Sequence, residues 1–365
     1  MCSSDLVDVS GDYALRIQRG PEADDDQVTV LSRDASVWLS LGSEIRIGAL
    51  DTTLALVINE DETFVIQAAG LPDIHLGIGF DASVSATAVG FSYNNTGRDW
   101  DQTVSVNVGD VDVSVAVQVR DDVATAIVTD LEARVADYVS LAGTFAFEKQ
   151  PASAESTASF LVVAQDASAF LDIGTAVHVG VSDVELAMVL LEDGRLALQT
   201  SGAAELSFGA GFASASAERI DFAYNNTGQD RAGDITLKVS DVSVSAPLNV
   251  ADGQTIINVT GLQAQIGDIL SISGDFGLRK TTDATPGQDE LQITSQNAAV
   301  SLTAGDVVTA AVRNVVMDMC LRGDDDLTLD LSGSGWLKVG QGTVVADAAR
   351  QDIGHVVGDA LVHHS

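Results

Sequence analysis

The stretch Phe91-Ser-Tyr-Asn-Asn-Thr-Gly-Arg-Asp99 occurs a second time in the chain as Phe222-Ala-Tyr-Asn-Asn-Thr-Gly-Gln-Asp230. The two occurrences are separated by one fixed interval, 225 − 94 = 131 residues from Asn94 to Asn225. A self-match with matching flanks at such an interval is the sequence signature of tandem copies of one structural unit. We therefore expect the chain to be built from repeats of about 131 residues.

Other segments recur at the same interval, to within one residue. Gly11-Asp-Tyr-Ala-Leu15 aligns with Gly143-Thr-Phe-Ala-Phe147 and with Gly274-Asp-Phe-Gly-Leu278. The start, Cys2-Ser-Ser-Asp-Leu6, looks like the translation of a sequencing adapter and is excluded from fold reasoning. The predicted organisation is a non-native scar at 1–6, the end of a partial repeat at 7–33, full repeats at 34–165 and 166–296, a partial repeat at 297–342, and a divergent tail at 343–365 that is a cap, a truncation or a frame slip.

Each repeat contains a hairpin with alternating apolar residues. Leu54, Leu56 and Ile58 precede an acidic turn, and Phe64 and Ile66 follow it. Alternation at period two on both sides of a polar turn is typical of a β-hairpin. We expect these large residues to form the face that packs in the core.

A second hairpin follows the first Asn-Asn-Thr-Gly segment. Valines alternate on both sides of Gly109-Asp110, and a two-residue connection would place Val108 opposite Val111 and Val106 opposite Val113. The valines would share one face, and the intervening Ser and Asp residues would form a wet face. The predicted fold class is all-β, with repeats of mostly antiparallel hairpins stacked into an elongated sheet, sandwich or solenoid-like array.

The composition limits the possible partners. The chain has 18 basic and 53 acidic residues, a formal charge of −35. Nucleic-acid binding needs clusters of Lys and Arg to neutralise phosphates, so we do not expect nucleic acid as a partner. The sequence has no uninterrupted apolar run of about 18 residues, so no membrane-spanning segment is expected.

Acidic turns are the candidate metal sites. Calcium takes six to eight oxygen ligands, which carboxylates and turn carbonyls can supply. A solvated acidic turn is the alternative, since none of these segments has the EF-hand loop order. The candidate residues for weak calcium binding are Asp24, Asp25, Asp26, Glu60, Asp61, Glu62, Asp324, Asp325 and Asp326. No other cofactor is expected.

The Asn-Asn-Thr-Gly segment has three interpretations. Asn and Gly accept left-handed backbone angles, which favours a turn between strands. Asn94-Asn-Thr96, Asn225-Asn-Thr227 and Asn258-Val-Thr260 also match the N-glycosylation pattern. A ligand-contacting loop is the third interpretation, because Asp99, Asp101 and Asp230 lie close by.

No catalytic motif is present. The sequence lacks His-Glu-x-x-His, Gly-x-Ser-x-Gly, Cys-x-x-Cys and a phosphate-binding glycine loop. We predict a non-enzymatic protein. A carboxylate pair for glycoside cleavage depends on distances in the fold and stays open at this point.

The Gly-x-Phe-x-Leu/Phe strands, the acidic hairpins and the Tyr-Asn-Asn-Thr-Gly turns resemble the tandem β-strand repeats of very large bacterial surface or secreted proteins of the adhesin type. The resemblance covers about residues 7 to 342. It implies a structural or adhesive array, located extracellularly or at the cell surface. Its implied partners are neighbouring repeats of the same chain, surface glycans or other cell-surface proteins.

Two other functions stay open. A sheet with one apolar and one polar face could form an elongated groove that carries lipid acyl chains. A polysaccharide-binding or polysaccharide-active β module is the other alternative.

Overall fold

The computed structural model describes residues 7–19, 26–41, 45–76, 82–108, 111–135, 139–152, 157–174, 176–209, 212–282, 289–304, 308–322, 327–339 and 342–356. These residues form β-strands, turns and short irregular segments, without a helix. The predicted all-β class with mostly antiparallel pairing is therefore confirmed. No helix in this part of the chain is long and apolar enough to cross a membrane.

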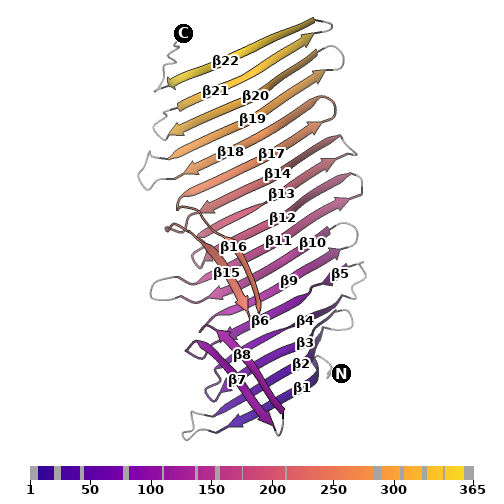
Figure 1. Ribbon diagram of the computed structural model, residues 1–365, viewed down its shortest axis with the longest axis vertical. Coiled ribbons are helices and arrows are strands. Elements are labelled where there is room, and N and C mark those ends of the chain that lie inside the picture. Colours follow the sequence, from indigo (N-terminus) through magenta and orange to yellow (C-terminus); the bar gives the residue numbers. More distant parts are fainter. Residues whose placement is uncertain are drawn as a thin grey trace. The chain divides into compact units, whose positions relative to one another are not determined.

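The chain divides into two compact units, which are described separately. Figure 1 labels the strands of both units. Unit 1 consists of Met1–Ser168, Glu185–Gly194 and Asp234–Pro247, and unit 2 of Ala169–Val184, Arg195–Gly233 and Leu248–Ser365. Two strands, β11 (Ser159–Ile173) and β12 (Val177–Leu191), have residues in both units.

Unit 1 contains an antiparallel sheet in the order β1–β2–β3–β4–β6–β9–β10, with β5 paired to β9. Two hairpins, β7–β8 and β15–β16, complete the unit. The bounds are β1 Val7–Gln18, β2 Gln27–Leu41, β3 Ile45–Asn59, β4 Phe64–Leu76, β5 Ala82–Ser85, β6 Ala88–Asn94, β7 Trp100–Val108, β8 Val111–Val119, β9 Ala124–Val135, β10 Val139–Gln150, β15 Asp234–Val239 and β16 Val242–Pro247.

Unit 2 contains an antiparallel sheet in the order β13–β14–β17–β18–β19–β20–β21–β22. Strands that follow one another in the sequence are also neighbours in this sheet, with one exception. β14 pairs with β17, and the chain makes the β15–β16 hairpin between these two strands. The bounds are β13 Leu196–Phe208, β14 Ala213–Asn225, β17 Gln254–Ile266, β18 Leu270–Thr281, β19 Glu290–Ala304, β20 Val308–Arg322, β21 Leu327–Val339 and β22 Gly342–Val356.

The β7–β8 hairpin has the register expected from its two-residue connection. Val108 pairs with Val111 and Val106 pairs with Val113, which confirms the prediction. The hairpin lies across β1, β2, β3, β4 and β6 rather than continuing their sheet. Its valines pack on small apolar residues of those strands, and together they form one buried cluster: Ala14, Leu31, Ala55, Val57, Val65, Trp100, Val104, Val106, Val115, Val117 and Val119.

A glutamine fixes the hairpin on the sheet. The Nε2 of Gln67 donates to the carbonyl of Ala116 at 2.9 Å, and its Oε1 accepts from the backbone N–H of Gln118 at 3.1 Å. Gln67 is buried, so these bonds satisfy its amide and the exposed backbone edge of β8 together. In the second hairpin region, Oε1 of Gln199 accepts from the backbone N–H of Asn249 at 2.6 Å.

The core lies on the opposite face from the one we expected. In unit 1 the residues with the smallest exposure on β3 and β4 are Ala55, Val57 and Val65, under the hairpin. Leu56 and Ile66 point to the other side of the sheet and are only half-buried. The physical reason is that small side chains let a second layer approach the sheet closely.

Left-handed residues interrupt the long strands at regular places. A β-bulge there places two residues opposite a single glycine, and the glycine has no Cβ to obstruct the approach. A Cβ added to the glycine would lie only 2.5 to 2.6 Å from the Cα of the facing alanine in each case. The pairs are Gly11 with Ala35 beside Asp34, Gly143 with Ala167 beside Asp166, and Gly274 with Ala298 beside Asn297.

Candidate functional site

The acidic turn at Glu60–Glu62 connects β3 and β4. The Asp61 carboxylate accepts hydrogen bonds from the hydroxyl of Thr63 at 2.6 Å and from its backbone N–H at 3.0 Å. These two bonds hold the pKa of Asp61 below its ordinary value. The backbone N–H of Glu60 donates to the carbonyl of Asp26 at 3.0 Å. The Asp61 carboxylate is therefore hydrogen-bonded within its own turn.

Of the other calcium candidates, the structure describes only Asp26, whose backbone carbonyl lies at this turn. Asp24, Asp25 and Asp324–Asp326 lie outside the described residues. Within the described part of the chain, no three His, Cys, Asp or Glu side chains come together in a way that could hold a metal ion. Calcium binding therefore stays a prediction.

The first Asn-Asn-Thr-Gly segment is a turn built on a buried asparagine. Asn94 is 0% exposed, and its Nδ2 donates to the carbonyls of Arg98 at 2.8 Å and Val119 at 3.1 Å. Its Oδ1 accepts from the N–H and the hydroxyl of Thr96 at 3.0 and 2.8 Å. The side chain thus has partners on both its donor and its acceptor side.

The second segment has the same bonds. Nδ2 of Asn225 donates to the carbonyls of Gln229 at 2.8 Å and Val250 at 3.0 Å, and Thr227 donates to its Oδ1 twice. Asn225 is 1% exposed. A glycan attaches at Nδ2, which in both turns is buried and bonded to two carbonyls. The folded chain therefore offers neither Asn94 nor Asn225 as a glycosylation acceptor, whereas Asn258 is exposed on β17.

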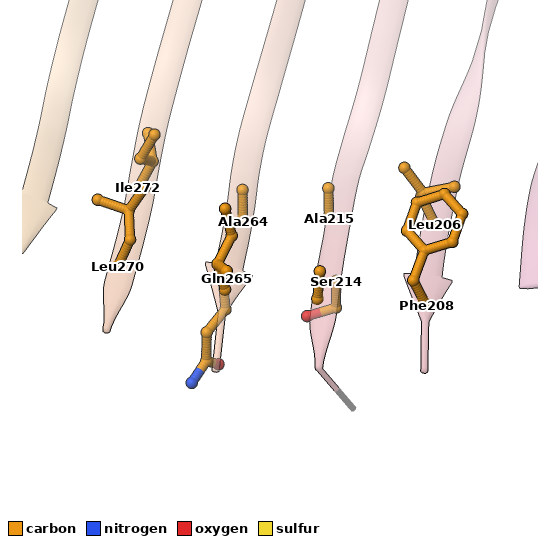
Figure 2. Close-up of a pocket in the computed structure, with 10 residues that line it drawn as sticks. Leu206, Phe208, Ser214, Ala215, Ala264, Gln265, Leu270 and Ile272 are labelled. Atoms are coloured by element: carbon orange, nitrogen blue, oxygen red, sulfur yellow. The ribbon is translucent and has the colours of Figure 1, made fainter. Parts of the chain in front are cut away.

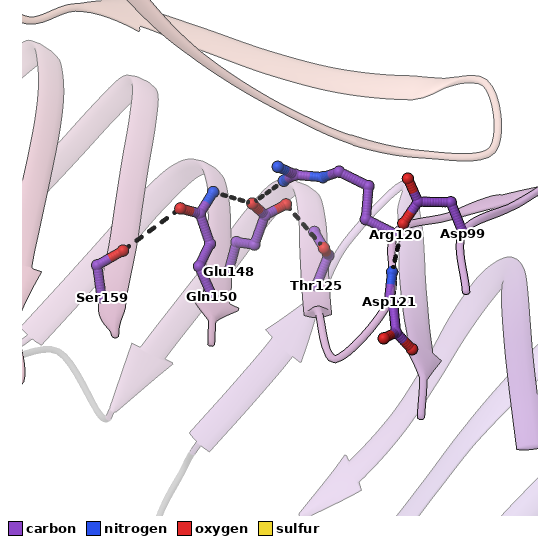
Figure 3. A network of polar contacts seen from close by, with 7 residues as sticks. All are labelled: Asp99, Arg120, Asp121, Thr125, Glu148, Gln150 and Ser159. Atoms are coloured by element: carbon purple, nitrogen blue, oxygen red, sulfur yellow. Dashed lines mark hydrogen bonds and ion pairs between the residues drawn. The ribbon is translucent and has the colours of Figure 1, made fainter. Parts of the chain in front are cut away.

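Unit 1 also contains a buried carboxylate that the sequence did not single out (Figure 3). Glu148 on β10 is 4% exposed. It accepts from the guanidinium of Arg120, from the hydroxyl of Thr125 at 3.0 Å and from Nε2 of Gln150 at 2.7 Å. A buried carboxylate is tolerated when its lone pairs are bonded in this way.

Glu148 has no acidic counterpart in the aligned segments, where Arg16 and Arg279 occupy its place. Its oxygens are occupied by donors and no second carboxylate faces it among the contacts described. The network can fix the end of β10 against β9 and the β8–β9 connection. It has the features of a structural ion pair rather than a catalytic pair.

Unit 2 contains one histidine held between two carboxylates. Nδ1 of His178 lies 2.6 Å from Oδ1 of Asp172, and Nε2 lies 2.8 Å from Oε1 of Glu205. Two hydrogen bonds raise the pKa of His178, and the bond to Asp172 has a larger effect than the bond to Glu205. The ring also stacks on Phe170, with 5.8 Å between centroids. The arrangement favours an imidazolium that donates from both nitrogens.

The sheet of unit 2 has one face that is apolar across its strands. Directly paired residues of neighbouring strands lie on the same face, and along this face Ala215, Ala264, Ile272 and Val300 follow one another from β14 to β19. Neighbouring positions on the opposite face are polar, such as Ser273 and Ser301. Large residues of the apolar face that remain exposed include Phe208, Ile266, Val300, Leu302, Val312, Leu331 and Leu337.

A hollow of about 220 Å³ lies on this face at one end of the strands (Figure 2). Small residues of β14 and β17, Ala213, Ala215 and Ala264, form its floor. Larger residues of the flanking strands β13 and β18 form its sides: Leu206, Phe208, Leu270 and Ile272. The hollow is a short apolar trough over β14 and β17.

Unit 1 has a comparable face on the side of its sheet away from the β7–β8 hairpin. Directly paired residues there include Leu56 with Ile66 and Phe91 with Ala126. Phe147 and Phe160 stack on this face, with ring centroids 6.2 Å apart. No described element covers it. Exposed residues of this face include Leu15, Ile17, Phe91, Phe147 and Phe160. The sequence analysis placed Leu56 and Ile66 of this face in the core, because alternation cannot tell a covered apolar face from an open one.

The chain was compared with known proteins. No protein-family model matches it, and no curated protein is significantly similar to it.

Proposed function

We propose that this protein binds the acyl or alkyl chains of lipids on the apolar faces of its two units. The observation that carries the proposal is the apolar face of unit 2, which continues across β13, β14, β17, β18, β19 and β20 with exposed large side chains. Exposed apolar patches above a few hundred Å² mark interaction sites in soluble proteins. Each methylene removed from water contributes about 0.8 kcal/mol, so a long alkyl chain gains several kcal/mol on such a surface.

The shape of the trough favours a chain-like ligand. Its floor of alanines on β14 and β17 lies between larger residues of β13 and β18, which leaves a narrow apolar depression. The polar residues Ser214 and Gln265 also line the hollow, but strand alternation directs their side chains to the opposite face of the sheet, and the Gln265 amide donates to the carbonyl of Gly267 at 2.8 Å. The trough therefore offers dispersion contacts and few hydrogen bonds, which suits an alkyl chain.

A pair of neighbouring substitutions tests the proposal. Ala215→Glu places a carboxylate in the floor of the trough, and Ser216→Glu places the same group one residue further on the polar face of β14. We expect monomeric hexadecanol to bind the unchanged protein saturably by native mass spectrometry, and Ala215→Glu to weaken binding at least about tenfold, because desolvating a charge is costly. Ser216→Glu should leave binding unchanged. Absent binding, or equal loss in the two variants, would refute the proposal.

We propose a second function, a structural or adhesive array of tandem repeats at the bacterial cell surface, on a different observation. The turns at Asn94 and Asn225 have the same set of side-chain hydrogen bonds. Equal architecture at a fixed interval supports repeats that stack on their neighbours. A glycan array probed with the full chain tests the adhesive part. Saturable binding of defined surface glycans would support it, and binding to none of them would count against it.

A further inference from the structure

Two lysines occupy matching places on the apolar faces. Lys149 is the residue before the end of β10 in unit 1, and Lys280 is the residue before the end of β18 in unit 2. Lys149 pairs with Ala124, and Lys280 pairs with Thr255 and Leu291. Strand alternation puts each lysine on the same face as the residue two positions earlier, which is Phe147 in one case and Leu278 in the other.

These lysines stand out from the positions around them. In the half of each face between the bulges and the strand ends that carry the lysines, the directly paired positions are otherwise apolar or carry a hydroxyl, as at Thr255, Ser32 and Ser295. Both lysines are exposed. Neither has a hydrogen bond or an ion pair with any residue that the structure describes. Two free ammonium groups therefore border apolar surface in a chain with a net charge of −35.

In a strongly acidic chain, these two lysines are candidate sites for an anionic ligand. A lysine ammonium is a compact positive charge with three donors and pairs well with carboxylate or phosphate. The surrounding acidic surface repels anions by its net field. An anion would therefore approach the apolar faces most favourably at Lys149 and Lys280, where a positive charge adjoins surface that an alkyl chain can cover.

We infer that the ligand is a single-chain amphiphile with an anionic head, carboxylate or phosphate, paired with Lys149 in unit 1 and with Lys280 in unit 2. The inference rests on the proposed lipid-binding function. The head would sit at the strand end, and the alkyl chain would run along the strand over Leu278, Phe276 and Ile272 in unit 2. At about 3.4 Å per residue, the strand from Lys280 to Leu270 provides a path of about 34 Å.

Three ligands and two double variants test the inference. The ligands are hexadecanoate, hexadecyl phosphate and hexadecanol, each kept below the concentration at which it forms micelles. The test variant is Lys149→Gln with Lys280→Gln. The control is Lys238→Gln with Lys338→Gln, which removes the same charge from exposed lysines that lie on the outer side of the β15–β16 hairpin and on the polar face of β21.

We expect the unchanged protein to bind at least one of the two anions about tenfold more tightly than the alcohol. The test variant should bind that anion no more tightly than hexadecanol, with hexadecanol binding unchanged, and the control variant should behave as the unchanged protein. The tighter of the two anions identifies the head group as carboxylate or phosphate.

The possible failures are distinguishable. If none of the three ligands binds, the proposed lipid-binding function is wrong. If hexadecanol binds as tightly as both anions, the apolar faces bind lipid but the inference about Lys149 and Lys280 is wrong. Equal weakening in the test and control variants would show a general charge effect and would also overturn the inference.

Discussion

Replacing Leu31 by alanine tests which face of the unit 1 sheet is the core. Leu31 on β2 is 0% exposed and belongs to the cluster under the β7–β8 hairpin. Leu15 on the neighbouring strand β1 is 57% exposed on the apolar face and is the matched control. The two changes remove the same atoms from opposite faces of adjacent strands.

The expected magnitudes follow from burial. A buried Leu→Ala change costs the transfer free energy plus a cavity term, about 3 kcal/mol. Full burial of a leucine contributes about 2 kcal/mol, so a leucine that is less than half buried loses about 1 kcal/mol or less. With a urea dependence of about 2 kcal/mol per M, the unfolding midpoint should fall by about 1.5 M for Leu31→Ala and by about 0.5 M for Leu15→Ala.

Trp100 provides the readout, because it lies in the same buried cluster as Leu31. In a background with Trp38→Phe and Trp336→Phe, its fluorescence reports the unfolding of unit 1 alone. A midpoint for Leu15→Ala equal to or below that for Leu31→Ala would refute the assignment of the hairpin side as the core.

Three further predictions concern the turns and the histidine. Asn225→Ala should cost about 3 kcal/mol in urea unfolding because it leaves buried backbone groups unpaired, whereas Asn226→Ala, at an exposed position, should cost about 1 kcal/mol or less; equal losses would contradict the buried network. Asp172→Asn should lower the pKa of His178 in an NMR titration. Because the pKa of His178 is raised in the folded state, this histidine stabilises the fold fully below about pH 6.5. The stabilisation is lost as the pH rises through the raised pKa. Calcium binding at the acidic turns predicts a higher melting temperature in millimolar calcium, whereas an unchanged melting temperature would favour solvated turns, as the two hydrogen bonds to the Asp61 carboxylate do for Glu60–Glu62.

Local patterns predicted the hairpins well. The two-residue connection was enough to set the pairing of Val106 with Val113, because loop length fixes the register of a tight hairpin. The turn at Asn94 was also predicted as a turn, from the conformational freedom of Asn and Gly. Its buried hydrogen bonds depend on the Val119 carbonyl of a strand that follows later, so the segment alone could not show them.

The position of the core could not be predicted from alternation. Both faces of β3 are apolar, with Leu56 on one side and Val57 on the other, and the larger residues gave the stronger signal. What decides the outcome is where the hairpin lies, which is a contact between distant parts of the chain. The buried Glu148 was missed for a similar reason, because its partners Arg120 and Thr125 come from the β8–β9 connection and from β9, and its aligned positions are arginines.

The β7–β8 hairpin has a consequence for how unit 1 responds to mechanical load. An antiparallel sheet pulled apart at its edge opens one strand at a time, because each strand is held mainly by its two neighbours. The hairpin contacts β1, β2, β3, β4 and β6 together. A pulling force on β1 must therefore either detach the hairpin or displace several strands at once. In a force-extension experiment, unit 1 should yield in one large step, and removing the hairpin's contacts should divide that step into smaller ones.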